Sequence, residues 1–294
     1  MTSRCTVVIP LFDKEAVVGR AIRSVMDQTV RDWTLIVVND GSTDGSTHVA
    51  REFADPRIRV IDQENAGPGA ARNSGLLLAH TPFVAFLDAD DEWRPDFLAR
   101  MLFALEEHGD VAVAYSSWLY GNDQRSVVGE QQSRGVSAGR WQLTPGTSPR
   151  LIKHRIDSLH TSACVARTAE ITKRQGFYDR ERCTYGEDAF LWARVLFAGC
   201  AVFRIPEPLI RFHTDASALS VGRASPYPLP PLLSKPMEVL TGASDGLETT
   251  VRAYLGWYAL FVFRRALLQR SGRTAIGAAR SFMKSQRRGR LGQR

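Results

Sequence analysis

The apolar stretch from Phe83 to Leu87 runs directly into three carboxylates, Asp88, Asp90 and Asp91. Five consecutive apolar residues, with aromatic and β-branched side chains among them, predict a strand that is buried on both faces. Such a strand delivers the residues that follow it to its carboxyl end, where ligands bind in open α/β sheets. Unpaired carboxylates are costly to bury, so we expect a cation or water beside them.

The Asp88-Ala89-Asp90 spacing suits a hard divalent cation. Such ions take oxygen ligands from one or two carboxylates and keep other positions for a substrate phosphate. The simpler interpretation is a solvated turn at the end of a strand. The segment alone does not decide between the two.

Three more strands are predicted upstream, over Cys5–Ile9, 33–38 and Ile58–Ile61, each an apolar run that ends in polar or turn residues. Apolar residues at helical spacing follow the first run, behind Asp13, which we expect to cap that helix. Strands and helices therefore alternate over the first ninety residues. This alternation predicts an α/β fold, with a mainly parallel sheet flanked by helices.

Two loops of this sheet carry further polar residues. In the turn after the second strand, Asp44 or Ser42 suits the N-cap of the next helix, but capping does not require Asp40 as well. In the loop from Gly67 to Gly75, two glycines flank a proline at the start of an Ala-rich helix, so backbone N–H groups and Arg72 can face an anion. A plain turn is the alternative, because the glycine spacing is not that of a dinucleotide site.

A second acidic pair, Glu187 and Asp188, precedes an apolar helical pattern. Negative charge is favoured in the first turn of a helix, so capping alone would explain the pair. Farther on, a strand-like run over residues 201–210, interrupted by two prolines, leads to His213. A histidine there is either structural or a ligand.

Together these segments resemble family 2 glycosyltransferases with the GT-A fold. Five motifs occur in the order and rough spacing of that family, and the resemblance covers about residues 5–215. The motifs are Val8-Ile9-Pro10-Leu11-Phe12, Val38-Asn39-Asp40-Gly41-Ser42-Thr43-Asp44, Gly67-Pro68-Gly69-Ala70-Ala71-Arg72-Asn73-Ser74-Gly75, Leu87-Asp88-Ala89-Asp90-Asp91 and Gly186-Glu187-Asp188. The resemblance implies metal-dependent transfer of a sugar from a nucleotide diphosphate donor, with inversion at the anomeric carbon.

The resemblance also implies where the nucleotide binds. It places Pro10, Phe12 and Glu15 beside the nucleotide, with Asp40 accepting the N3 proton of the base and Arg72 near the base or the diphosphate. Uracil and thymine both carry that proton, so the expected donor is a UDP- or dTDP-sugar. A site built around such a hydrogen bond rejects bases that cannot make it.

The metal and the ribose are assigned in the same way. By resemblance Asp88 holds the ribose hydroxyls and Asp90 binds the metal, which we expect to be Mn²⁺ or Mg²⁺. His213 matches a family histidine that reaches the metal or the diphosphate, and we place it with the metal ligands while keeping the structural alternative.

Asp188 matches the general base of the family best, and Glu187 is expected to orient an acceptor hydroxyl or Arg194. The implied function is the transfer of a hexose to a hydroxyl acceptor, either a glycan or a lipid-linked sugar, in polysaccharide or cell-envelope synthesis. The alternative is a non-catalytic protein of the same fold that binds sugar nucleotides or partners. The donor sugar and the acceptor cannot be read from the sequence.

The chain divides by pattern into a GT-A domain over 1–220 and a C-terminal extension over 221–294. Within the first we expect a nucleotide-binding half over about 1–118 and an acceptor half over about 119–220. The extension is predicted to contain a linker, an amphipathic helix and a basic tail. Glycines among polar residues over 119–160 predict an irregular insertion on the acceptor side.

Cysteine spacing bears on the compartment. The four cysteines show neither metal-ligand nor Cys-x-x-Cys spacing, and no secretory signal precedes the first predicted strand. We therefore expect a reducing, cytoplasmic location. His108, His154 and His160 lie in no motif and are expected to be ordinary surface or core residues.

The basic charge is concentrated at the C-terminus. Residues 249–294 hold eleven Lys or Arg and no Asp or Glu, while the whole chain carries +7, so residues 1–248 carry −4. The apolar run Ala253–Phe263 is shorter than the roughly 20 residues that cross a bilayer. A basic segment with aromatic residues suits the headgroups of an anionic membrane, so we expect peripheral attachment to the inner face of the plasma membrane.

Two alternatives remain for this extension. The apolar run can pack as a helix on the body or on a second protomer, and the basic end can be disordered. Nucleic-acid binding is disfavoured because the sequence contains no recognised nucleic-acid module. Whether the chain forms a homo-oligomer stays open.

Overall fold

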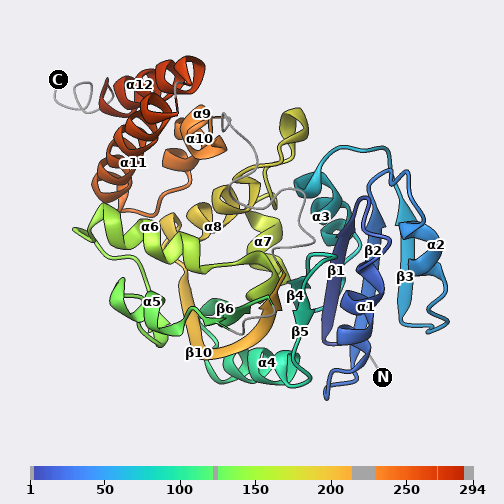
Figure 1. Cartoon of the computed structure of the whole chain (residues 1–294). Helices are drawn as coiled ribbons and strands as arrows, with labels where there is room; N and C mark the ends of the chain where they lie inside the picture. The colour runs from blue at the N-terminus through green and yellow to red at the C-terminus, as the bar shows by residue number, and fades with distance from the viewer. Residues whose placement is uncertain (1–2, 122–124, 214–228, 270, 288–294) are drawn as a thin grey trace.

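The computed structural model describes residues 3–121, 125–213, 229–269 and 271–287. Its strands form one mixed sheet between two layers of helices (Figure 1). In sheet order they are β3 (Ile58–Asp62), β2 (Trp33–Asn39), β1 (Cys5–Leu11), β4 (Phe83–Phe86), β9 (Cys164–Arg167), β6 (Val111–Tyr120), β10 (Ala201–Phe212) and β5 (Glu92–Trp93). Two short strands join at the side, β7 (Arg125–Ser126) on β6 and β8 (Gly139–Trp141) on β10.

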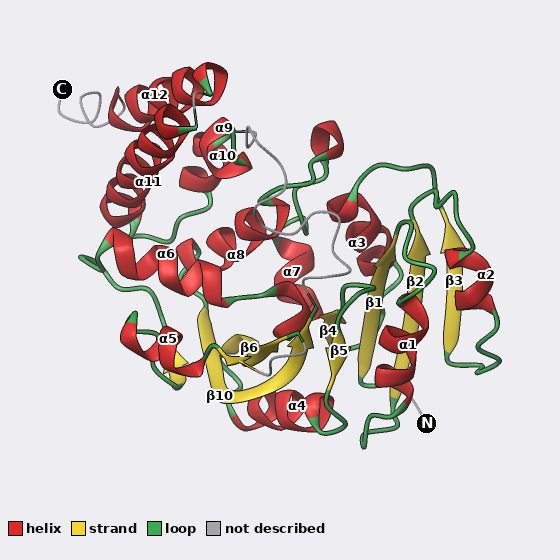
Figure 2. Ribbon diagram, viewed as in Figure 1, coloured by secondary structure: helices red, strands yellow, loops and turns green. Residues whose placement is uncertain are grey.

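Helices cover both faces of the sheet, and the last four pack together at one end of the molecule (Figure 2). The helices that contribute to one core are α1 (Val18–Met26), α2 (Ser46–Arg51) and α4 (Phe97–Glu107). The opposite core takes α3 (Pro68–Leu77), α6 (Pro149–Ser158), α7 (Thr168–Lys173), α8 (Glu187–Phe197), α9 (Pro231–Ser234), α10 (Pro236–Thr241), α11 (Glu248–Leu268) and α12 (Gly272–Arg287). The remaining helical segments are α5 (Val128–Ser133), η1 (Thr161–Ala163) and η2 (Arg180–Arg182).

The first four strands confirm the α/β prediction. β1 pairs in parallel with both β2 and β4, and β2 pairs in parallel with β3. Side chains alternate along β1, so that Val8 enters one core while Val7 and Ile9 enter the other. The predicted strand ends are correct to within two residues.

The second part of the sheet is mixed. β9 runs antiparallel to its neighbours β4 and β6, whereas β10 is parallel to β6. The register of β10 shifts between Ile205 and Pro208 and again between Pro208 and Ile210. Proline lacks the N–H that a ladder needs, so the two prolines bend the strand without ending it. β10 therefore brings His213, the next residue, to the edge of the sheet.

The capping predictions are only partly correct. The expected cap of α1 by Asp13 is wrong, because α1 begins at Val18 without a side-chain cap. Asp13 has a φ of 48° and its carboxylate accepts the N–H of Thr43 at 2.7 Å. The expected N-cap of α2 by Asp44 or Ser42 is correct only in part: the N-cap residue is Gly45, which has no side-chain cap, but the Asp44 carboxylate accepts the N–H of Ser46, the first residue of the helix, at 3.0 Å.

The irregular insertion predicted over 119–160 is wrong for most of its length, because α5, β8 and α6 form there; residues 122–124 lie outside the described residues. A buried arginine explains why this segment is ordered. Arg204 of β10 is fully buried and donates to Gln131 Oε1 at 2.6 Å, Ser117 Oγ at 2.8 Å and the carbonyl of Val136 at 3.2 Å. These hydrogen bonds attach this polar segment to the sheet. The composition of the segment alone did not predict that it would be folded.

The apolar run Ala253–Phe263 lies within α11, which packs on the body. Tyr254, Leu255 and Ala259 are at most 1% exposed within the core that α6 and α8 share with it. The packed-helix alternative is therefore correct for this face of α11. Among the residues described, no helix combines the length and the hydropathy needed to cross a bilayer.

Candidate active site

Four strands carry the predicted site residues to one edge of the sheet. Because β1, β2 and β4 are parallel, the loops that follow them leave from the same edge. β6 and β10 are also parallel to each other, and β10 ends beside the β4 loop, where Asp91 accepts the N–H of His213 at 3.3 Å. The topology thus brings residues far apart in the sequence into one site.

Arg72 lies at the centre of this site. Its side chain is only 6% exposed and forms ion pairs with Asp88 Oδ1 at 2.6 Å and with Glu187 Oε1 at 2.9 Å. Of the two roles expected for Glu187, orienting an acceptor hydroxyl stays a prediction, and orienting Arg194 is wrong, because Glu187 pairs with Arg72 and the guanidinium of Arg194 lies over the ring of Phe190. One buried cation therefore joins the β4 loop to the first residue of α8.

Arg72 affects the pKa values of the Asp88 and Glu187 carboxyl groups to different extents. Burial is the largest single influence on Asp88 and opposes its ionisation, but the charge and hydrogen bond of Arg72, together with the nearby His160 and Lys14, outweigh it and lower the pKa of Asp88. At Glu187, burial and the adjacent Asp188 outweigh Arg72 and raise the pKa to about 7. Asp88 is thus the permanent anion of the trio, whereas Glu187 exchanges a proton near neutral pH.

Asp90 and Asp91 follow Asp88 into a crowded, mostly buried corner. Asp90 Oδ2 lies 2.8 Å from Lys14 Nζ. Asp91 is fully buried, and its Oδ2 has no hydrogen-bond partner among the residues that the structure describes. Burial, together with the Asp88 and Asp90 carboxylates, raises the pKa of Asp91 well above its usual range. A further cation in this corner would relieve the repulsion.

The described residues contain no cluster of three or more His, Cys, Asp or Glu arranged around one metal position. His213, expected near the metal, has its Nε2 3.5 Å from Glu92 Oε2. The carboxylates therefore fit an ion that takes one or two protein oxygens and completes its shell with substrate phosphates and water, as Mg²⁺ and similar ions do.

Asp40, expected at the nucleotide base, also fixes the loop before α3. It is 3% exposed and its oxygens accept the side-chain N–H of Gln63 at 2.8 Å and the backbone N–H groups of Ala66 and Gly67 at 2.9 Å. Gly67 has a φ of 93°, a conformation that favours glycine. Oδ2 accepts one of these bonds, so a lone pair remains for a ligand donor.

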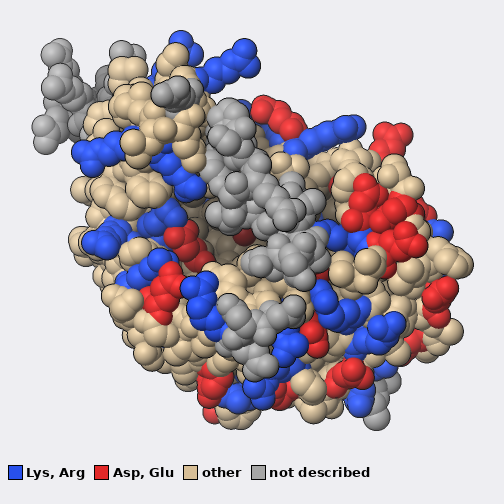
Figure 3. Space-filling view, in the orientation of Figure 1, with Lys and Arg blue, Asp and Glu red and all other residues tan. Residues whose placement is uncertain are grey.

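The other predicted nucleotide residues lie at the rim. Pro10 is part of β1, and the ring of Phe12 beyond it is 44% exposed. Glu15 accepts the N–H of Gly45 at 3.1 Å, so it ties the loop after β1 to the loop after β2. Figure 3 shows a cluster of acidic side chains at one end of the visible face, whereas Lys and Arg side chains are spread over much of the rest of that face.

Asp188 stands in the first turn of α8, where negative charge is favoured. The helix starts after Gly186, whose φ of 78° is left-handed. Asp188 Oδ1 accepts the N–H of Ala189 at 2.6 Å, and Oδ2 accepts the hydroxyl of Thr161 at 3.4 Å. The contact with Thr161 turns the carboxylate of Asp188 toward the η1 segment.

The prediction that His160 is an ordinary residue missed its place in this site. Its ring lies 4.7 Å from that of Phe212 and 5.3 Å from that of Trp118. Burial lowers the pKa of His160 more than Asp88 and Asp188 raise it, so the imidazole is neutral at pH 7. No motif surrounds this histidine in the sequence, so only the fold reveals it.

The family model described as "Glycosyl transferase family 2" matches residues 6–174. Among curated relatives, the putative glycosyltransferase EpsH of Bacillus subtilis is 36% identical over 74% of this chain and 63% of its own. The UDP-Glc:alpha-D-GlcNAc-diphosphoundecaprenol beta-1,3-glucosyltransferase WfgD of Escherichia coli is 32% identical over 42% of this chain and 49% of its own. The chain thus spans about half to two thirds of the length of these relatives.

Solved structures share the fold. The S. aureus TarS 1–349 complex with UDP-GlcNAc superposes with a TM-score of 0.73 at 19% identity, over 97% of this chain and 81% of that one. The mannosyltransferase PcManGT of Pyrobaculum calidifontis, in complex with GDP-Man and Mn²⁺, gives a TM-score of 0.55 at 17% identity, over 97% and 88% of the two chains. At these identities the similarity shows the fold, which confirms the expected GT-A architecture.

Proposed function

The chain belongs to glycosyl transferase family 2, whose model matches more than half of it, and from this premise we propose that it is an inverting glycosyltransferase. Its donor is a UDP- or dTDP-sugar and its acceptor is a hydroxyl of a glycan or a lipid-linked sugar in cell-envelope or polysaccharide synthesis. The observation that carries the proposal is the Arg72 link between Asp88 and Glu187, because it holds the β4 carboxylates next to Asp188.

Donor binding is supported by the rim and by Asp40. The exposed ring of Phe12 offers a stacking surface, and Asp40 offers a carboxylate held by three hydrogen bonds. Uracil and thymine carry the N3 proton that such an acceptor needs. The TarS neighbour is in complex with UDP-GlcNAc, and WfgD is named for UDP-Glc, which favours a uridine donor.

A divalent cation, Mn²⁺ or Mg²⁺, completes the donor site in this proposal. Asp90 would hold it together with the diphosphate, where it would neutralise the charge of the leaving group. The crowded carboxylates and the orphaned Asp91 oxygen support such a cation. His213 remains a candidate second ligand. The PcManGT neighbour is in complex with Mn²⁺.

The chemical step requires a base for the acceptor hydroxyl. We assign this role to Asp188, which takes the proton as the hydroxyl oxygen attacks the anomeric carbon. The bond between that carbon and the diphosphate breaks with its electron pair on the leaving group, and the attack from the opposite side inverts the configuration. Glu187 holds Arg72, which keeps Asp88 ionised for the ribose hydroxyls.

Nucleotide selectivity tests this proposal. We expect UDP or dTDP with Mn²⁺ to raise the melting temperature, because a ligand at 100 times its Kd stabilises the folded state by about 2.7 kcal/mol. CDP is the matched control, since cytosine differs from uracil at the edge that would meet Asp40 and lacks the N3 proton. Thermal shift with each diphosphate, with and without Mn²⁺, measures this.

Three results would contradict it in different ways. No shift with any diphosphate would remove the donor proposal, and an equal shift with CDP would remove Asp40 from base recognition. Binding without turnover of any sugar nucleotide would favour the alternative, a non-catalytic protein of the same fold.

We also propose that the C-terminal helices lie on the cytoplasmic face of an anionic membrane. Large apolar side chains remain exposed on α11 and α12 although the opposite face of α11 is packed. Exposed arginines stand among them, and the segment has no acidic residue after Glu248. The exposed apolar residues are Leu260, Phe261, Leu267, Leu268, Ile276 and Met283. Apolar residues with cations of one sign suit the headgroup layer of such a membrane.

Vesicle binding tests the membrane proposal. We expect the protein to sediment with phosphatidylglycerol vesicles at low salt and less so at high salt, because surface charges are screened within about 10 Å at 0.1 M. Changing Leu267 and Leu268 together to Gln should weaken binding. Leu77→Gln is the matched control, since that residue is 78% exposed on α3. Truncation at residue 249 would be a poor test because α11 is part of the core.

Protein that stays in the supernatant at low salt would overturn the membrane proposal. A dimer in analytical ultracentrifugation that the Leu267 and Leu268 double variant abolishes would instead assign this face to a second protomer. Binding to DNA that needs the same two leucines would point to a nucleic acid.

A further inference from the structure

The short η1 segment links the two acidic parts of the site. Thr161, its first residue, donates its hydroxyl to Asp188 Oδ2 at 3.4 Å. Ser162, the next residue, accepts the backbone N–H of Asp88 on its hydroxyl at 3.1 Å. The segment therefore reaches from the end of β4 to the first turn of α8. His160 directly precedes it, so this histidine is placed beside the same gap.

Both the backbone and the ring of His160 are held in place. Its carbonyl accepts the N–H of Ala163 at 2.8 Å and the thiol of Cys164 at 3.2 Å. Its ring packs on Phe212 and Trp118, whose ring centroids lie 4.7 and 5.3 Å away. A side chain that is already fixed loses little conformational entropy when a ligand binds to it.

One nitrogen of this imidazole is accessible to a ligand. His160 is partly exposed, and its Nδ1 is buried without a hydrogen-bond partner among the residues that the structure describes. Nε2 is not enclosed in that way, so it is the nitrogen that a ligand can reach. A neutral imidazole nitrogen either donates or accepts, and a sugar hydroxyl does both, so each tautomer can pair with a hydroxyl.

Charged groups of the site surround this histidine. Burial is the largest influence on the pKa of His160 and lowers it, so the ring is neutral at pH 7. The charged groups that also act on it are Asp88, Asp188, Arg72 and Asp90. In the proposed function Asp88 and Asp90 hold the donor, whereas Asp188 is the base. His160 thus borders the space between the leaving group and the base.

The chemistry of the proposed transfer determines what occupies this space. In an inverting displacement the anomeric carbon lies between the leaving diphosphate and the attacking oxygen. The hexose ring must therefore lie between the diphosphate, which the proposal places at Asp90, and the acceptor hydroxyl at Asp188. The hydroxyl groups of that ring are then the polar groups that His160 meets.

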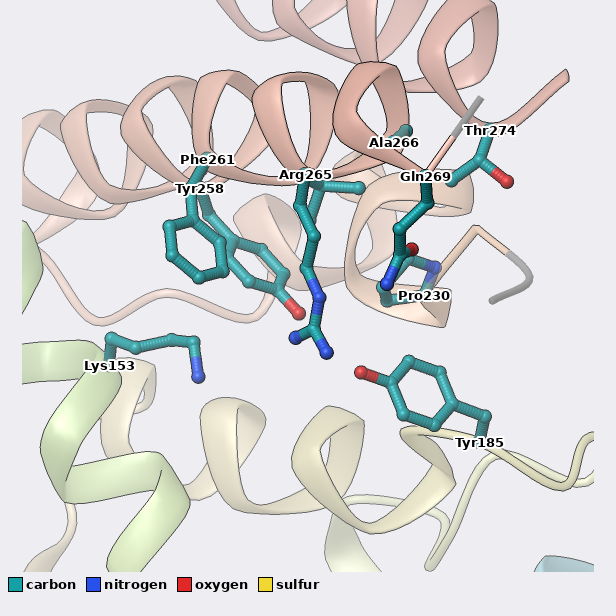
Figure 4. Close-up of a pocket in the computed structure, with 10 residues that line it drawn as sticks. Lys153, Tyr185, Pro230, Tyr258, Phe261, Arg265, Ala266, Gln269 and Thr274 are labelled. Carbon is teal, nitrogen blue, oxygen red and sulfur yellow. The ribbon is translucent and has the colours of Figure 1, made fainter. Parts of the chain in front are cut away.

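The pocket between α6, α8 and α11 is a poor alternative place for the sugar. Figure 4 shows the side chains that line it, among them Tyr185, Tyr258 and Arg265. It holds about 50 Å³. A water needs roughly 10–15 Å³ of such space, so the pocket takes about three to five waters, which is less than a hexose requires. No carboxylate of the site is among the described residues that line it.

We propose that His160 binds a hydroxyl of the transferred sugar through Nε2 and thereby helps to select the donor sugar. This inference rests on the proposed glycosyltransferase function and deepens it, because it names a residue of the sugar subsite that no sequence motif indicated. A site that bonds a hydroxyl disfavours sugars that place this group elsewhere, since its own polar atom is then left unpaired.

His160→Phe tests this inference, because it removes both nitrogens and keeps a flat ring on Phe212 and Trp118. The probes are UDP-glucose, UDP-galactose, UDP-N-acetylglucosamine and dTDP-glucose, with UDP and dTDP as the sugar-free references. Isothermal titration with Mn²⁺ and without acceptor gives each Kd. We expect the variant to bind the preferred sugar nucleotide about 3- to 10-fold more weakly, the range for a neutral hydrogen bond, and the matching diphosphate as the wild type does. The preference among sugars should narrow by the same factor.

His154→Phe is the matched control. His154 lies on α6, and both of its ring nitrogens are buried without a partner among the described residues. The charged groups that act on its pKa all lie outside the site; they are Arg134, Asp157, Arg150 and Lys153. An unpartnered nitrogen is therefore present there without the surrounding carboxylates, and this variant should leave every Kd unchanged.

His160→Gln separates hydrogen bonding from packing, because it keeps an amide near the position of Nε2. It should bind the preferred sugar nucleotide more tightly than His160→Phe does. Binding of the free diphosphate shows that each variant is folded. Where His160→Phe does not fold, His160→Leu replaces it in the same comparison.

Three results would overturn the inference. They are an unchanged Kd for the sugar nucleotide in His160→Phe, an equal loss for the sugar nucleotide and its free diphosphate, and an equal loss in the Gln and Phe variants. A wild type that binds neither UDP nor dTDP contradicts the proposed function and this inference with it. A wild type that binds them, beside a variant without a sugar-specific loss, contradicts this inference alone.

Discussion

Replacing Asp188 by Asn should lower the rate of sugar transfer by roughly 10²- to 10⁴-fold, the contribution of a positioned general base. Asparagine keeps the shape of the side chain and can still accept the N–H of Ala189, so the start of α8 should survive. It cannot take a proton from the acceptor hydroxyl. Because Asp188 contacts no donor group in this proposal, the Kd for UDP with Mn²⁺ should stay near the wild-type value.

Glu187→Gln is the matched variant, because it is an adjacent and equally isosteric change. It removes one of the two carboxylates on Arg72, so we expect it to alter donor affinity more than the chemical step. Single-turnover rates and UDP affinity separate the two effects. A near wild-type rate in Asp188→Asn would assign the base to Glu187 or another residue. A product of retained anomeric configuration, seen by proton NMR, would defeat the inverting mechanism itself.

The strands of the nucleotide side could be predicted because each is an uninterrupted apolar run buried on both faces. Phe83–Phe86 is the clearest case, since its four residues are all buried and it sits between two other strands. Asp13 could not be placed in the same way. Its sequence position suits a helix cap, but a contact with Thr43, thirty residues away, holds its backbone at a positive φ.

The carboxylates of the site were found from the sequence, but their partners were not. Arg72 lies 16 residues before Asp88 and 115 before Glu187, and only the parallel sheet brings the three together. His160 shows the same limit. Its position depends on β9 inserting antiparallel between β4 and β6, and no local pattern around the histidine reports that pairing.

The C-terminal extension was predicted as amphipathic and basic, and composition could not say which face would be covered. α11 has apolar side chains around most of its circumference, so it can bury Tyr254 and Leu255 on the body while Leu260 stays 45% exposed. A helix that is apolar on all sides is expected to be enclosed. The apolar side chains that stay exposed on α11 therefore suggest that a membrane or a partner covers this part of the helix.

The second prediction with a large expected effect concerns Asp90, the proposed metal ligand. Asp90→Ala should abolish detectable transfer, a loss of roughly 10³-fold or more, because the several kcal/mol that a Lewis acid contributes to the leaving group would be lost. Mn²⁺ should also cease to strengthen UDP binding. Asp90 is 7% exposed and pairs with Lys14, so Asp90→Asn, which keeps the shape, is made alongside it.

Isothermal titration of UDP with and without Mn²⁺ measures the coupling between metal and nucleotide in each variant. Asp96→Ala is the control, since Asp96 precedes α4 and pairs with Arg94 at 3.4 Å on the exposed surface. It should bind UDP and Mn²⁺ as the wild type does. Coupling that persists in both Asp90 variants would remove Asp90 from the metal site. The ion would then have to rest on Asp88 or Asp91, and the use of Asp88 would require Arg72 to give up that carboxylate when the donor binds.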